Sequence, residues 1–210
     1  MQTRDVHLYI FDTLADWEPG YAIAQINQPA YQSRPGRYRV RSVGMTREPV
    51  RTAGGLAIVP DLTLSELAPE DSALLILPGG DTWLSGVNQA ALEKAKQFHA
   101  AGVPIAAICG ATAGLASVGL LDEVAHTSNA AEFLAPVPGY KGAERYREAR
   151  VVSDGGIITA PSFAPVDFAR AIFEVLEVYS KATLAAWYGL HTTGEARYFY
   201  DMVKAEKAAR

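Results

Sequence analysis

The sequence predicts a single α/β domain in which a doubly wound, mostly parallel sheet is flanked by helices. Short apolar runs alternate along the chain with amphipathic stretches of helical period, which is the pattern of this fold class. Two of the runs, 73–77 and 103–108, are apolar almost throughout, as expected of strands that are covered on both faces. A chain of 210 residues, 49% of them hydrophobic, is long enough to bury one sizeable core.

The predicted strands are runs rich in branched apolar residues. They cover residues 6–11, 38–43, 73–77 and 103–108. Glycine pairs interrupt two further stretches of strand character, which predicts two hairpins. These hairpins cover residues 50–59, around Gly54 and Gly55, and residues 150–159, around Gly155 and Gly156.

Two helices are predicted between and after these strands. Residues 88–101 carry apolar side chains on one face, begin at Asn88, a residue type that caps helices, and stop at Gly102. Residues 165–179 repeat the spacing, with Pro165 in the first turn, where proline is tolerated.

The last part of the chain is amphipathic and rich in aromatic residues. Residues 181–210 include Trp187, Tyr188 and Tyr200, so we expect a helical extension that packs on a domain of residues 1–180 or mediates dimerisation.

Composition excludes several classes of protein. With 19 Lys and Arg against 23 Asp and Glu, the net charge of −4 argues against disorder and against nucleic-acid binding. No apolar run approaches the roughly 20 residues that span a bilayer, and the first residues lack signal-peptide character, so a cytoplasmic protein without a membrane partner is expected. A single cysteine cannot form an internal disulfide or a CxxC metal site, and no phosphate-binding glycine loop is present; we expect no metal and no cofactor.

That single cysteine occupies a position suited to a nucleophile. Cys109 follows the apolar run 103–108 and precedes a predicted helix of small residues, which is the pattern of a tight strand-to-helix turn that exposes a nucleophile. A thiol at a helix N-terminus is stabilised as thiolate, so we expect its pKa to lie at roughly 3.5–7.5.

Two other loops are expected at the same edge of the sheet. Gly79 and Gly80 follow the run 73–77, and their backbone N–H groups could combine with that of Gly110 to hold an oxyanion. An acidic loop after the first strand ends in Glu18. Parallel sheets gather such loops in one crevice at the carboxyl ends of the strands.

These three loops, in this order and spacing, resemble the ThiJ/DJ-one/PfpI superfamily. The likeness covers about residues 5 to 180 and rests on Asp16-Trp17-Glu18-Pro19-Gly20, Leu77-Pro78-Gly79-Gly80, Ala106-Ala107-Ile108-Cys109-Gly110 and Ser162-Phe163-Ala164-Pro165-Val166-Asp167. The resemblance implies the flavodoxin-like, class I glutamine amidotransferase-like fold and a homodimer. It also implies that Cys109 is the nucleophile, that Glu18 is the acid bonded to it, and that Gly80 and Gly110 are the oxyanion donors.

A third site residue is expected in the segment after the elbow helix, where many family members have a histidine. The sequence there reads His126-Thr127-Ser128-Asn129, and it leaves His126, Ser128 and Asn129 open for this place. Thr112, in the first turn after the cysteine, is a further candidate for substrate binding.

Two departures from the family pattern argue against two of the activities known in the family. Peptidase-type members have a histidine directly after the cysteine, where this chain has Gly110, and glutamine amidotransferases carry a late His-x-Glu, whereas 162–167 has no histidine. Neither activity is therefore expected.

Three functions remain open from the sequence. The first is a cysteine-dependent hydrolase or lyase acting on a small carbonyl, amide or isonitrile compound. The second is a non-enzymatic redox or stress-response protein whose Cys109 is oxidised, with Glu18 bonded to the product. The third is an inert binding module. In the first two, Glu18 is expected to keep its proton beside the thiolate, with a pKa above the ordinary ~4.3.

Overall fold

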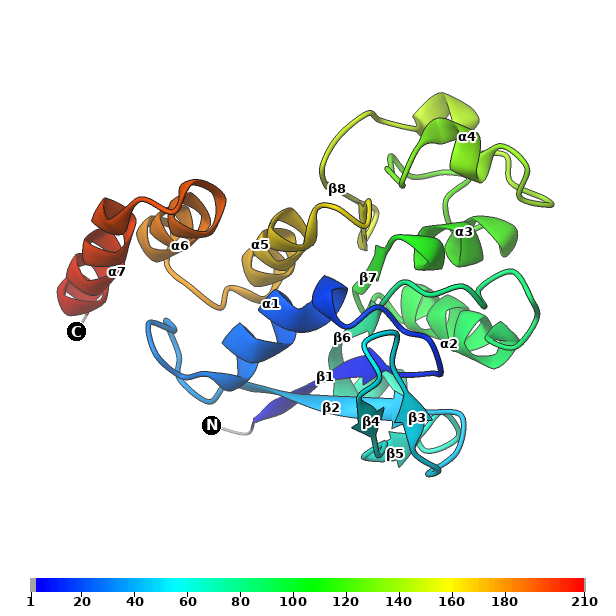
Figure 1. The fold of residues 1–210 in the computed structure, drawn as a ribbon, viewed down its shortest axis with the longest axis horizontal. Helices are drawn as coiled ribbons and strands as arrows, with labels where there is room; N and C mark the ends of the chain where they lie inside the picture. Colours follow the sequence, from blue (N-terminus) through cyan, green and yellow to red (C-terminus); the bar gives the residue numbers. More distant parts are fainter. Residues whose placement is uncertain (1–2, 210) are drawn as a thin grey trace.

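The fold is organised around one seven-stranded sheet, and the computed structural model describes residues 3–209 (Figure 1). The strand order is β5-β2-β1-β6-β7-β9-β8, parallel throughout except for β8, which runs antiparallel to β9. The strands are β1 (Arg4–Tyr9), β2 (Tyr38–Gly44), β5 (Leu62–Thr63), β6 (Ser72–Leu77), β7 (Ile105–Ile108), β8 (Val152–Asp154) and β9 (Ile157–Ala160). The predicted doubly wound α/β fold is confirmed.

Helices cover both faces of this sheet. Helix α1 (Trp17–Asn27) packs against α5 (Pro165–Leu176) on one face, while α2 (Gln89–Ala100) and α3 (Gly110–Ser117) lie together on the other (Figure 1). Because helices cover both faces of the sheet, every residue of β6, β7 and β9 is buried. The apolar runs in the sequence predicted this burial for β6 and β7. No helix in the described part of the chain is long and apolar enough to cross a membrane.

The order of the strands places a crevice at the centre of the sheet. The chain leaves β1 toward β2 on one side and later returns to β6 on the other side, so the winding direction reverses between β1 and β6. Loops at the carboxyl ends of the strands diverge at such a reversal, and ligands of α/β proteins bind there.

Both predicted hairpins form, in two different settings. Strands β3 (Val50–Arg51) and β4 (Ala57–Ile58) make a separate two-stranded sheet, whereas β8 and β9 pair at the edge of the main sheet. Three short helical elements and β5 were not predicted, because each spans four residues or fewer and carries too little periodicity. These helical elements are η1 (Pro69–Asp71), α4 (Ala131–Leu134) and η2 (Ala143–Arg145).

The expected capping role of Asn88 is wrong. Its side chain makes no cap hydrogen bond to α2; instead it accepts a hydrogen bond of 2.9 Å from Tyr9 Oη and donates one of 2.9 Å to Thr82 Oγ1. Asn88 thus ties the loop after β6 to β1 through a buried polar network.

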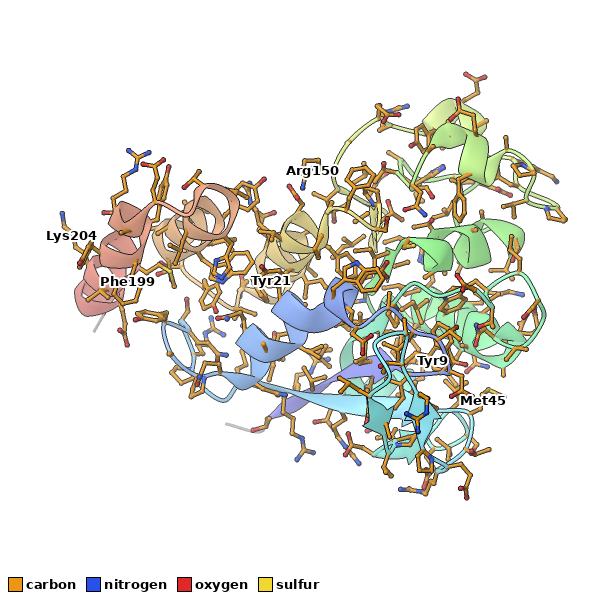
Figure 2. All side chains as sticks on the ribbon, in the orientation of Figure 1. Tyr9, Tyr21, Met45, Arg150, Phe199 and Lys204 are labelled. Carbon is orange, nitrogen blue, oxygen red and sulfur yellow. The ribbon has the colours of Figure 1, made fainter. Side chains whose placement is uncertain are left out.

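The C-terminal extension consists of two helices rather than one continuous segment. Helices α6 (Lys181–Thr193) and α7 (Ala196–Ala209) are separated at Gly194, whose φ of 74° ends α6 in the left-handed conformation. Trp187 of α6 is fully buried and packs edge-on against Phe173 of α5. Helix α7 packs on α6 at the end of the molecule where Figure 2 labels Phe199 and Lys204, so the extension packs on the domain as predicted.

Candidate active site

Three loops meet at the carboxyl edge of the neighbouring strands β1, β6 and β7. The first leads from β1 into α1 and carries Glu18, the second contains Gly79 and Gly80, and the third is the turn at Cys109. The backbone N–H of Ala15 donates to the carbonyl of Gly79 (3.0 Å), which joins the first loop to the second. The structure therefore brings together the three segments that the sequence places at one edge.

Cys109 lies in a strained turn. Its φ of 58° and ψ of −126° are in a region that residues with a side chain rarely adopt. Hydrogen bonds hold this conformation: the Cys109 N–H donates to the Ala160 carbonyl (2.9 Å), and the Cys109 carbonyl accepts from Thr112 Oγ1 (2.6 Å). The residues that follow in α3 are small and buried, which lets α3 pack close to the sheet. This geometry confirms the predicted strand-to-helix elbow.

Glu18 is a buried carboxyl in the first turn of α1. Its side chain is fully buried, and Oε2 accepts a 2.5 Å hydrogen bond from the Gly79 N–H. Its other oxygen, Oε1, has no hydrogen-bond partner among the described residues, and the Cys109 thiol interacts with the carboxyl group. Burial raises the pKa of Glu18 from 4.5 to about 7, against the opposing effect of the Gly79 N–H. The expected rise in its pKa is thus supported.

The expected acidity of the Cys109 thiol does not follow from this geometry. Burial raises the pKa of Cys109 above its ordinary value, and the negative charge of Glu18 raises it further. Hydrogen bonds from Asn129 and from the Gly110 N–H lower it, but they do not outweigh burial. The helix N-terminus alone therefore does not set the ionisation of this thiol, and the Glu18–Cys109 pair must be treated as one titrating unit.

Asn129 is the third side chain of the site. Its Nδ2 donates to Cys109 Sγ at 3.4 Å, and its Oδ1 accepts from the Ser162 N–H at 2.9 Å. Because Oδ1 is engaged by a backbone donor, the amide is oriented with its N–H group toward the sulfur.

The other two candidates from the same segment do not face Cys109. His126 is fully buried, with Nδ1 bonded to the Val124 carbonyl (2.8 Å) and Nε2 to Tyr140 Oη (2.7 Å). Ser128 bonds through its Oγ to Thr112 Oγ1 at 2.7 Å. The catalytic role expected of His126 is not supported, because both of its ring nitrogens are used to hold a loop.

The backbone N–H groups of Gly80 and Gly110 are the candidates for holding an oxyanion, and that of Gly110 already interacts with the Cys109 sulfur. Both residues line the cavity beside Cys109, and neither N–H donates to another backbone or side-chain oxygen among the described residues. Gly79 and Thr112 do not serve this purpose: the Gly79 N–H is taken by Glu18, and the Thr112 hydroxyl supports the elbow. The Gly79 N–H is thus not free for an oxyanion, and a substrate-binding role of Thr112 stays a prediction.

The space beside Gly110 is filled by the glycine loop. A Cβ atom at residue 110 would lie 2.5 Å from the Gly80 carbonyl oxygen and 3.2 Å from Trp83 Cδ1. Trp83 is itself buried, and its Nε1 donates to the Pro78 carbonyl at 2.9 Å. The site therefore excludes any side chain directly after the cysteine while the loop keeps this position.

Cys109 opens into a cavity of about 670 Å³ at this edge. Glu18 and Trp83 of its lining are buried, whereas Trp17, Leu84 and Phe133 are exposed to solvent. The lining residues are Thr13, Ala15, Trp17, Glu18, Ala53, Gly80, Asp81, Trp83, Leu84, Cys109, Gly110, Ala113, Asn129 and Phe133. A volume of this size accommodates a small organic ligand.

Several of these residues were not identified from the sequence. Trp83 holds the carbonyl of Pro78 within its own loop, Ser162 acts through its own backbone N–H, and Leu84 and Phe133 lie in segments without a recognisable motif. What these residues have in common is that folding brings them close to Cys109, and a single sequence does not show such proximity. Among the described residues, no group of three or more His, Cys, Asp or Glu side chains is placed to hold a metal ion.

Comparison with known proteins gives consistent results. The DJ-1/PfpI family model matches residues 4–175. A Bacillus subtilis protein named "Uncharacterized protease YoaZ" is 42% identical over 97% of this chain and 98% of its own length, and "Uncharacterized protease YdeA" of the same organism is 34% identical over 80% and 81%.

Solved structures agree with this assignment. The crystal structure of a thiJ/pfpI family protein from Bacillus anthracis has a TM-score of 0.92 and 40% identity over 98% of both chains. The DJ-1 superfamily protein Atu0886 from Agrobacterium tumefaciens has a TM-score of 0.81 and 30% identity, covering 92% of this chain and all of its own. The elbow cysteine, the buried glutamate and the full-length similarity lead to one conclusion: this chain belongs to the DJ-1/PfpI family.

Proposed function

We propose that the protein is a cysteine-dependent hydrolase or lyase that acts on a small carbonyl, amide or isonitrile compound. The observation that carries this proposal is the pairing of Cys109, held at a φ of 58° on the elbow, with a buried carboxyl that has one unpartnered oxygen. Strained backbone of this kind is found at active sites, where the surrounding structure holds it in place. A carboxyl with a pKa of about 7 can both accept and release a proton near neutral pH, as a general base must.

The site supports a simple sequence of proton and electron movements. Cys109 Sγ attacks the electrophilic carbon and forms the C–S bond, while the thiol proton passes to Glu18 Oε1. The electron pair of the carbonyl π bond moves onto oxygen, which the N–H groups of Gly80 and Gly110 hold. Asn129 Nδ2 stabilises the sulfur while it carries negative charge. With an aldehyde, Glu18 then returns the proton to the oxygen. With an amide, Glu18 protonates the nitrogen as the C–N bond breaks and the carbonyl re-forms, and a water molecule that gives its proton to Glu18 then attacks the S-acyl carbon and releases the Cys109 thiol.

The geometry disfavours peptide hydrolysis, although two curated relatives are named as uncharacterized proteases. Thiol proteases usually pair the cysteine with a histidine that acts as both base and acid. No histidine lines the described cavity, His126 is bonded elsewhere, and residue 110 has no room for a side chain. Glutaminase chemistry of the His-x-Glu type is disfavoured because residues 162–167 contain no histidine.

A redox function is the second candidate. A protonated Glu18 beside the sulfur would donate a hydrogen bond to a sulfinate on Cys109, and its Oε1 has no competing nitrogen or oxygen partner among the described residues. This candidate uses the same pair of residues but requires no turnover.

The decisive experiment assays a panel of small aldehydes, amides and isonitriles with wild type, Cys109→Ser and Glu18→Gln. We expect turnover that is abolished in Cys109→Ser and reduced about 10²- to 10⁴-fold in Glu18→Gln, the usual contribution of a general base. Glu48→Gln, which removes an exposed carboxylate, is the matched control and should behave as wild type. Stoichiometric oxidation of Cys109 by peroxide without turnover of any compound would favour the redox candidate instead.

A further inference from the structure

The mouth of the Cys109 cavity carries three large apolar side chains that are exposed to solvent. Trp17 is 56% exposed, Leu84 54% and Phe133 38%, and all three line the cavity. They come from the first residue of α1, from the loop after β6 and from α4. Single exposed apolar residues are ordinary, but three of them around one opening mark a surface that binds apolar groups. We refer to Trp17, Leu84 and Phe133 as the apolar rim.

Apart from Cys109, the ionisable side chains that line the cavity are acidic. Among the described residues that line it, none is Lys, Arg or His, while Glu18 and Asp81 are both acidic. A ligand carrying a carboxylate, phosphate or sulfate would therefore meet acidic groups without a counter-charge. Repulsion from the buried Glu18, when it is ionised, is screened less than repulsion from the exposed Asp81.

We propose that the substrate of Cys109 is a neutral electrophile that carries a hydrophobic substituent of about the size of an aromatic ring, which the apolar rim holds. The reactive carbon reaches the sulfur at the polar inner end, and the substituent remains at the outer end between Trp17, Leu84 and Phe133. The cavity of about 670 Å³ is larger than a two- or three-carbon compound needs, which supports a ligand with such a substituent. This inference rests on the proposed role of Cys109 as nucleophile.

Alkylation of the single cysteine measures this selectivity without any knowledge of the reaction. The sulfur displaces iodide from an iodoacetyl reagent: the C–S bond forms, the C–I bond breaks with its electron pair on iodide, and the thiol proton is lost to Glu18 or solvent. Three reagents test the three features of the cavity: iodoacetamide is small and neutral, N-phenyl iodoacetamide is neutral and aromatic, and iodoacetate is anionic. Because Cys109 is the one cysteine in the chain, mass spectrometry reports one site.

Rates are divided by those of N-acetylcysteine thiolate, which removes the intrinsic reactivity of each reagent. We expect the N-phenyl reagent to be favoured over iodoacetamide by about tenfold or more, since even one methylene group in a hydrophobic pocket changes a rate by about 10- to 200-fold. Trp17→Ala and Phe133→Ala should each reduce this preference. Iodoacetate should be disfavoured, and Asp81→Asn should relieve part of that effect. Val175→Ala, which shortens an exposed apolar side chain of α5, is the matched control and should change nothing.

The possible results separate this inference from the proposed function. If the three reagents have the same selectivity toward Cys109 as toward N-acetylcysteine, the inference is wrong. It is also wrong if the alkylation rates fall as the protein concentration rises, because a second copy of the chain would then cover the apolar rim. If the selectivity is found but no compound of the panel is turned over, the inference holds for ligand binding and the enzymatic proposal fails alone. Efficient turnover of an anionic compound without the alkylation preference would overturn the inference and leave the enzymatic proposal intact.

Discussion

The Glu18 carboxyl reaches the Cys109 thiol across Gly79. A Cβ atom at residue 79 would overlap the Glu18 carboxyl and lie 2.6 Å from Cys109 Cβ, so the two groups can approach each other only because no side chain stands between them. The same glycine donates its N–H to Glu18 Oε2 and fixes the carboxyl in place. Gly79 therefore positions the Glu18–Cys109 pair, and its N–H is bonded to the carboxyl.

The ionisation of Cys109 should depend on the charge of Glu18. Above pH 7 Glu18 is ionised and its charge opposes formation of the thiolate, so Glu18→Gln should lower the pKa of Cys109. Glu18→Leu removes the charge but leaves no donor and a less polar surrounding, so its effect should be smaller. Titration of thiolate absorbance in wild type and both variants checks this; three coincident curves would show that Glu18 does not face the sulfur.

Glu18 should make the protein less stable as the pH rises. Its pKa is raised from 4.5 to about 7 in the folded state, so the folded protein holds this proton more tightly, and stability is lost as pH rises between these values. The loss by about pH 8.5 amounts to about 3 kcal/mol at most. Urea unfolding at about pH 5.5 and about pH 8.5 should show that Glu18→Gln gains stability over wild type at the higher pH. An equal difference at both pH values would contradict the raised pKa.

His126 should matter for stability and not for the reactivity of Cys109. Its two ring nitrogens bond to the Val124 carbonyl and Tyr140 Oη, so His126→Phe leaves buried partners unsatisfied and should cost about 1–3 kcal/mol of unfolding free energy. Tyr140→Phe removes one of these bonds and should cost less. The alkylation rate of Cys109, measured on folded protein, should equal that of wild type in both variants. A marked drop in that rate with unchanged stability would restore a catalytic role for His126.

Gly110 should not tolerate even a methyl group. The added Cβ of Gly110→Ala would lie 2.5 Å from the Gly80 carbonyl oxygen, and relief of the clash must move the loop from which we propose that Gly80 binds an oxyanion. We expect a loss of about 1–3 kcal/mol, as for overpacked cores, together with slower turnover. Gly20→Ala is the control, because nothing lies within 4 Å of its Cβ position. Wild-type stability and rate in Gly110→Ala would mean that the loop is free to shift.

The protein should form a homodimer, which we propose to involve α7. Phe199 is 45% exposed and Tyr200 69% exposed on this helix, and the net charge of −4 is too small to oppose association. Sedimentation at micromolar concentration should give about twice the 22.5 kDa of one chain. The double variant Phe199→Ser and Tyr200→Ser should shift the equilibrium toward the monomer. A single 22.5 kDa species in wild type would refute the proposal.

The fold and the elbow could be predicted because short-range patterns encode them. The runs 73–77 and 103–108 became β6 and β7, which are buried on both faces, since continuous apolar strands are stable only where helices cover both sides of a sheet. Cys109 was found from its immediate neighbours, an apolar strand before it and small residues after it. Element ends were less accurate: the first strand ends at Tyr9 rather than at residue 11.

The third site residue, the protonation of the pair and the apolar rim were decided by tertiary structure. His126, Ser128 and Asn129 lie within four residues, and what selects Asn129 is the N–H of Ser162, which belongs to a segment 33 residues away. The pKa of Cys109 was misjudged because the adjacent helix end is visible in the sequence, whereas burial and the charge of Glu18 act through space. Near neighbours in the chain determine the backbone geometry at Cys109. Groups that only folding brings together determine which side chain faces the sulfur and how strongly that side chain holds a proton.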